Sequence, residues 1–183
     1  YSYDPATLAL DAENITIDPD GPGPQPALTR ILDRGSDTLG RESAMGILPV
    51  SGGAAEHFIN YGYDTSGRMS SVTSPAGTFN YTYAPGSSLL STVTGPIHTV
   101  TNTWEPNRDV LASKENKINS TNTVVSSFTY TVNPLSQRTS VQTSGTAFNS
   151  APADWAWGYD ALGQVVSADS PTPAFDRAYQ YDA

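Results

Sequence analysis

The sequence contains no cysteine, which excludes zinc ribbons, disulfide-stapled scaffolds and cysteine nucleophiles. Basic residues are scarce: 9 Lys and Arg stand against 18 Asp and Glu, giving a net charge of −9. Lys114 and Lys117 are the only lysines, so no basic tract exists that could follow nucleic-acid phosphates or hold the chain on an acidic membrane. No apolar run approaches the ~20 residues of a spanning helix. We therefore expect no nucleic-acid partner and no membrane insertion.

Motifs for catalysis and cofactor binding are also missing. Neither a Gly-x-Ser-x-Gly element, a phosphate loop nor a dinucleotide fingerprint occurs in the sequence. The two histidines, His57 and His98, have no partner at metal-ligand spacing, and His98, in a Thr-rich strand, is expected to be a surface or lining residue and not a catalytic one. We therefore predict that the chain is not an enzyme, and that it has no catalytic, metal or cofactor residues.

Acidic residues offer two weaker hypotheses. Segment 18–23 (DPDGPG) has oxygen ligands at a spacing that calcium loops use, but Thr29 stands where an EF-hand would place its Glu. We interpret this segment as an acidic loop. Carboxylate pairs such as Asp154 and Asp160 keep a polysaccharide-active enzyme as a third hypothesis, although a turn-capping role explains Asp160 better.

Composition indicates an all-β protein. Only 15% of the 183 residues are charged, and their place is taken by 21 serines, 21 threonines, 15 glycines and 14 prolines. Thr and Tyr suit strands, whereas Gly, Pro, Asn and Ser punctuate them. The length fits one domain, and the start at Tyr1, without an initiator Met or signal peptide, leads us to expect an internal or processed fragment.

Internal repetition is the most informative feature. Aromatic residues recur as doublets one residue apart, which places both rings on the same face of a strand. The six doublets are Tyr1/Tyr3, Tyr61/Tyr63, Tyr81/Tyr83, Phe128/Tyr130, Trp157/Tyr159 and Tyr179/Tyr181.

A turn sequence follows these doublets. Tyr63-Asp64-Thr65-Ser66-Gly67-Arg68 returns as segment 159–164 (YDALGQ), and a worn copy is segment 36–41 (SDTLGR). Looser copies follow Tyr83, Trp104 and Tyr130. Asp can close an Asx-turn, and Gly three residues later can supply the positive φ of a type I turn with a G1 bulge. The repeat therefore predicts one β-hairpin per copy.

This pattern resembles the YD-repeat (RHS-repeat) family, whose members include bacterial RHS proteins, insecticidal toxin-complex shells and animal teneurins. The resemblance covers most of the chain and is closest at Tyr61–Val72. It implies a fold of consecutive antiparallel β-hairpins wound side by side into a spiralling sheet, which forms the wall of a shell or solenoid. We expect residues 1–183 to form one such segment, with a Pro/Gly-rich loop at 18–26, a degenerate linker at 46–57 and the best-defined repeats at 58–183.

The resemblance also implies a function. We expect a non-enzymatic wall segment of a large secreted or cell-surface bacterial protein, whose shell encloses a C-terminal polypeptide or toxin. The alternative is an extracellular adhesion or carbohydrate-binding scaffold, with copies of the chain associating edge to edge into filaments. The expected partners are neighbouring repeats, identical copies, enclosed cargo or an extracellular glycan.

Two sets of residues are singled out. Trp155 lies outside the doublets and is the candidate sugar platform. Arg41, Arg68 and Arg138 follow their turns, and each is expected to fold back to an Asp or a backbone carbonyl. The repeat-structural residues are Tyr3, Asp4, Asp37, Gly40, Arg41, Tyr61, Tyr63, Asp64, Gly67, Arg68, Tyr81, Tyr83, Trp104, Tyr130, Arg138, Trp157, Tyr159, Asp160, Gly163, Tyr179, Tyr181 and Asp182.

Overall fold

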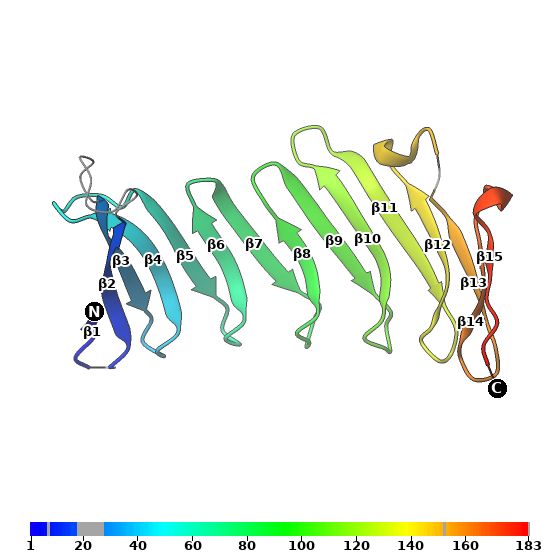
Figure 1. Ribbon diagram of the computed structural model, residues 1–183, viewed down its shortest axis with the longest axis horizontal. Coiled ribbons are helices and arrows are strands. Elements are labelled where there is room, and N and C mark those ends of the chain that lie inside the picture. Colours follow the sequence, from blue (N-terminus) through cyan, green and yellow to red (C-terminus); the bar gives the residue numbers. More distant parts are fainter. Residues whose placement is uncertain (7, 18–27, 152, 183) are drawn as a thin grey trace. The chain divides into compact units, whose positions relative to one another are not determined.

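The computed structural model describes residues 1–6, 8–17, 28–151 and 153–182. These described residues form fifteen β-strands and two short 3-10 turns (Figure 1). The chain divides into two units, residues 1–80 and 81–183. The predicted all-β class and the succession of antiparallel hairpins are confirmed, because the strand order follows the sequence order.

Unit 1 is an antiparallel sheet of hairpins. Its strands pair in chain order, and among the described residues β1 pairs with β2 alone. The strands are β1 (Ser2–Tyr3), β2 (Leu10–Ile17), β3 (Leu28–Ser36), β4 (Glu42–Pro49), β5 (His57–Tyr63), β6 (Met69–Ser74) and the first residues of β7 (Gly77–Tyr83).

Unit 2 continues the same hairpin pattern. A 3-10 turn, η1 (Thr146–Phe148), lies between its fifth and sixth strands, and a second, η2 (Pro173–Phe175), precedes its last strand. The strands are β8 (Leu90–Thr94), β9 (His98–Trp104), β10 (Leu111–Ile118), β11 (Thr123–Val132), β12 (Arg138–Ser144), β13 (Trp155–Tyr159), β14 (Val165–Asp169) and β15 (Arg177–Ala178).

Four of the aromatic doublets lie within strands, as predicted. They are the pairs in β5, β7, β11 and β13. The doublet Tyr179/Tyr181 was also expected in a strand, but β15 ends at Ala178, just before it. The predicted bulges are present too: the register shifts at the turn end of the hairpins, for example between Gly62 and Tyr63.

The sheet has almost no closed core. Among the described residues only Val141 and Ala168 are buried apolar side chains. Strand alternation separates two kinds of face: in β9, Thr99, Thr101 and Thr103 share one face, while Trp104 lies on the other. Stability must therefore depend largely on the hydrogen-bond ladder and on cross-strand pairs.

The weakest part of the repeat pattern is more regular than the sequence indicated. β2, β3 and β4 all fall in residues 10–49, which carry no aromatic doublet. Of the expected linker 46–57, residues 46–49 belong to β4, 50–56 connect the strands, and His57 begins β5. The candidate calcium loop (18–23) and the Pro/Gly-rich loop (18–26) lie outside the described residues. Thr29, which stands where an EF-hand would place its Glu, lies in β3.

Candidate functional site

In the repeated turn, one aspartate side chain accepts most of the hydrogen bonds that hold the turn together. At Asp64, Oδ1 accepts the N–H groups of Ser66 (2.9 Å) and Arg68 (2.9 Å), and Oδ2 accepts Arg68 Nε (2.8 Å). The Asp64 N–H donates to the Arg68 carbonyl (2.8 Å). We call the first residue of such a turn the opening residue, and the residue whose carbonyl accepts its N–H the closing residue. Gly67 has φ +78, so the predicted positive-φ glycine is in place.

The same geometry recurs in other turns of both units. Asp37 binds its closing residue Arg41 through the main-chain N–H (3.0 Å) and Nε (2.7 Å). Asp160 accepts the N–H of its closing residue Gln164 at 2.8 Å. The pairing expected for Arg41 and Arg68 is thus present in the structure.

These contacts shift the titration of two carboxyl groups. The side-chain hydrogen bond from Arg41 is the main cause that lowers the pKa of Asp37 from its ordinary value of 3.8. At Asp64, burial alone would raise the pKa, but the hydrogen bonds and charge of Arg68 outweigh it, and the pKa is lowered. Both carboxylates therefore stay charged in mildly acidic solution.

One turn was placed wrongly by the sequence. Asn133 is an opening residue, since Oδ1 accepts the N–H of Gln137 (3.0 Å) and its own N–H donates to the Gln137 carbonyl (2.9 Å). Ser136 occupies the glycine position with φ +65. The closing residue is therefore Gln137, and Arg138 lies one residue later. Instead of meeting an Asp or a carbonyl, the Arg138 guanidinium carbon lies 4.1 Å from the ring centroid of Tyr130.

We call the residue before the first residue of a turn the ring position, and at several turns this residue joins adjacent hairpins. The side chain at the ring position donates to the carbonyl of the residue that follows the previous closing residue. The bonds are Tyr63 Oη to Glu42 (2.7 Å), Trp104 Nε1 to Leu90 (3.0 Å), Tyr159 Oη to Arg138 (2.6 Å) and Tyr181 Oη to Val165 (2.8 Å). These bonds could not be predicted from the sequence, because variable loops separate the partners.

A second link joins neighbouring turns within unit 2. Gln137 Nε2 donates to the Gly163 carbonyl (2.9 Å), and Arg108 donates to the Asn133 carbonyl (2.9 Å). Arg108 also forms an ion pair with Glu105, the opening residue of its own turn. Because Val132 occupies the ring position of the Asn133 turn and has no donor, Arg108 supplies the link there.

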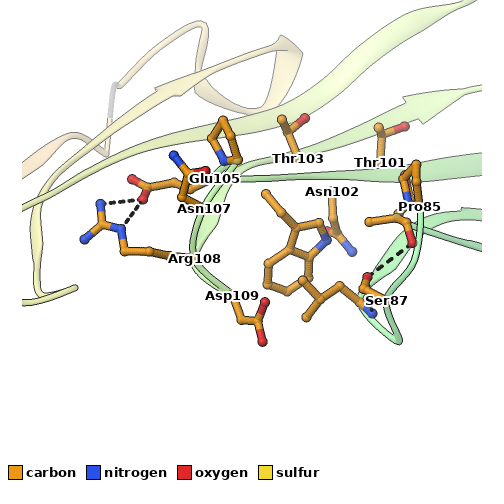
Figure 2. Close-up of a pocket in the computed structure, with 14 residues that line it drawn as sticks. Pro85, Ser87, Thr101, Asn102, Thr103, Glu105, Asn107, Arg108 and Asp109 are labelled. Carbon is orange, nitrogen blue, oxygen red and sulfur yellow. Dashed lines mark hydrogen bonds and ion pairs between the residues drawn. The ribbon is translucent and has the colours of Figure 1, made fainter.

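A hollow of about 580 Å³ lies between two turns of unit 2, residues 84–89 and 105–110. Trp104 and Leu89 contribute apolar lining, and Asn102 and Asp109 contribute polar lining. Figure 2 shows Thr101 and Thr103 on the opposite side of β9 from Asn102, and the guanidinium of Arg108 turned toward Glu105. Asp109 is exposed.

Trp155, Asp154 and Asp160, the remaining candidates within the described residues, lie on or beside β13. Trp155, the candidate sugar platform, is the first residue of β13, where strand alternation places it on the same face as Trp157 and Tyr159. Asp154 and Asp160 lie at opposite ends of β13, roughly 20 Å apart at ~3.3 Å per residue, too far for a glycosidase pair. Asp154 accepts the Thr143 N–H (2.6 Å).

His57 and His98 are exposed. Within the described ranges, no three His, Cys, Asp or Glu side chains gather where they could hold a metal ion. None of the helical turns in these ranges has the length and apolar character of a membrane-spanning segment.

Comparisons with solved structures identify the fold. The TcdB2-TccC3-TEV crystal structure matches 100% of this chain and 10% of its own, with 15% identity and a TM-score of 0.69. TcdB2-TccC3-Cdc42 matches 99% and 10%, with 16% identity and 0.69. The Tc holotoxin pore of Photorhabdus luminescens matches 88% and 8%, with 14% identity and 0.65. The chain thus spans about a tenth of these chains. No family model matches, and no curated protein does.

Proposed function

We propose that this chain is a wall segment of a YD-repeat (RHS-repeat) protein, with a structural and non-enzymatic role. The observation that carries this proposal is the ring-position bond. It recurs at Tyr63, Trp104, Tyr159 and Tyr181, and in each case it fastens one hairpin to the hairpin before it. A ligand-binding or catalytic domain has no need of one bond repeated along successive hairpins, whereas a wall built from stacked hairpins depends on it.

In the larger protein, the wall belongs to a secreted or cell-surface shell that encloses a C-terminal polypeptide, such as a toxin. Two findings support this assignment. The fold matches segments of TcdB2-TccC3 structures over the full length of the chain. The scarcity of buried side chains also fits a thin wall better than a compact domain, since among the described residues only Val141 and Ala168 are buried apolar ones.

The test is electron microscopy of the full protein that contains this segment, purified from its native source. Closed hollow particles, each the size of one long chain, are the expected result. Limited proteolysis provides the second readout: any polypeptide that follows the wall should resist digestion in intact particles and lose that protection once the particles are opened. Extended filaments, or equal digestion before and after opening, would overturn the enclosure proposal.

A further inference from the structure

The hollow beside Trp104 has an internally filled counterpart in unit 1. Tyr63 and Trp104 both occupy ring positions and make the same bond to the preceding hairpin. Over Tyr63 the chain places its own cation, since the Arg41 guanidinium carbon lies 4.1 Å from the ring centroid. Arg41 is the closing residue of the preceding turn. The repeat therefore has a place for a guanidinium between two neighbouring turns, against the aromatic ring.

At Trp104 this place is not filled by an arginine. Leu89 is the closing residue of the preceding turn, because its carbonyl accepts the Ala84 N–H at 2.8 Å. The leucine side chain carries no charge and no hydrogen-bond donor. Elsewhere in unit 2, the donors Arg108 and Gln137 reach from one turn to the next. Leu89 supplies no such donor across the junction where the hollow of about 580 Å³ lies.

The charges around the hollow select a cation. Asp109 lines the hollow, is exposed and forms no ion pair with any residue in the described ranges. The one cation in the lining, Arg108, is already paired with Glu105. The whole chain carries a net charge of −9, which draws cations toward it and repels anions. Trp is also the aromatic residue that attracts a cation most strongly.

We propose that the hollow binds the arginine side chain of an extended peptide segment from another polypeptide. The guanidinium lies on the Trp104 ring, as Arg41 lies on Tyr63, and donates to the Asp109 carboxylate. A planar guanidinium suits this place better than an ammonium group because it can stack on the ring and bind the carboxylate with two parallel N–H groups. The inference does not depend on the enclosure proposal, because it concerns one junction and its ligand class.

The probe is a set of Gly/Ser-flanked peptides that differ only in one central residue: arginine, lysine or citrulline, the neutral isostere of arginine. Binding to the full chain is followed by NMR at the Trp104 indole N–H, with intrinsic tryptophan fluorescence as a second signal. The arginine peptide should bind at least ~5-fold more tightly than the citrulline peptide, about the discrimination that a cation–π contact provides. Equal binding of the arginine and citrulline peptides, or no saturable binding, overturns the proposal. Equal binding of the lysine peptide overturns the assignment of a guanidinium site.

Two variants test the location without removing Trp104. Asp109→Asn removes the charge in the hollow, and no turn hydrogen bond of the described structure involves this side chain; it should weaken arginine-peptide binding ~3-fold or more. Leu89→Arg supplies the missing guanidinium from within the chain and should abolish peptide binding. The matched control is Leu162→Arg, which adds the same charge at an exposed turn position outside the hollow. Unchanged binding to the Leu89→Arg variant, or equal loss in both arginine variants, contradicts the proposed site.

Discussion

The hydroxyl of Tyr63 donates a 2.7 Å hydrogen bond to the carbonyl of Glu42, which lies 21 residues earlier and in the preceding hairpin. The bond links the turn ends of two hairpins that are not joined by the ordinary strand ladder at this point. Because Tyr159 and Arg138 form the same bond in unit 2, also 21 residues apart, the relationship belongs to the repeat and not to one local contact.

Tyr63→Phe should therefore lower the free energy of unfolding by about 1 kcal/mol, the net contribution of a typical hydrogen bond, while it keeps the ring under Arg41. The measurement is thermal and urea unfolding by circular dichroism. Tyr61→Phe is the matched control, since its hydroxyl has no hydrogen-bond partner among the described residues. Equal destabilisation by both variants would mean that the Glu42 contact contributes nothing.

The turn aspartates should make the stability depend on acid. The pKa values of Asp37 and Asp64 are lowered in the folded chain, so both carboxylates stabilise the fold above their unfolded value of 3.8. This contribution is lost as the pH falls below about 4 and passes through the lowered folded pKa values. The double variant Asp37→Asn, Asp64→Asn should be less stable than the parent at pH 7 and should lose less stability between about pH 4 and pH 2.

Unfolding midpoints measured across this pH range check the prediction. Asparagine is a suitable replacement because Asn133 already opens a turn in this chain and accepts the N–H groups of Leu135 and Gln137. The variant therefore keeps the turn acceptor and removes the charge. An acid dependence as steep as that of the parent would show that other groups control it.

Local patterns explain how much of this fold could be predicted. An aromatic doublet followed by Asp and Gly defines a strand, a turn and a bulge within about ten residues, and the structure has all three around Tyr63 and Tyr159. The Asn133 turn was misplaced because Asn and Ser136 replace the usual Asp and Gly, so that the sequence points to Arg138 as the closing position. The hydrogen bonds of the turn are kept after both replacements, but the Asp-x-x-Gly sequence motif is lost.

Contacts between hairpins could not be predicted from the sequence. The acceptor of each ring-position bond is a main-chain carbonyl, which any residue provides, so Glu42 and Leu90 carry no recognisable signal. The hollow beside Trp104 was missed for a related reason: Leu89 is informative only when it is compared with Arg41 in the equivalent turn. Trp155 was predicted as a sugar platform because it lies outside the aromatic doublets. Strand alternation, however, places Trp157 and Tyr159 on the same face of β13.

Gly145 should be the least replaceable glycine described. Its φ is +103, and a Cβ at this position would lie 2.6 Å from the Val125 carbonyl oxygen. Gly145→Ala should therefore cost about 3 kcal/mol or more, since backbone strain and a main-chain clash add. Gly52→Ala is the control, because Gly52 has φ +79 and open space around it, and it should cost only ~1–2 kcal/mol. Similar losses in the two variants would show that the Val125 strand moves away readily.

Ser136→Gly should stabilise the chain. Ser136 holds φ +65 at the turn position that glycine occupies in the Asp37, Asp64 and Asp160 turns, and an L-residue there costs ~1–2 kcal/mol. The serine hydroxyl returns little, since its contact with Arg108 is 3.4 Å long. Allowing for the greater entropy of glycine in the unfolded chain, the unfolding free energy should rise by about 0.5–1 kcal/mol. The reverse change, Gly163→Ser, should lower it, because φ is +83 and the new Cβ would lie 2.8 Å from Gln137 Nε2. Urea unfolding of both variants measures the two effects, and a loss of stability in Ser136→Gly would mean that the long Arg108 contact outweighs the backbone strain.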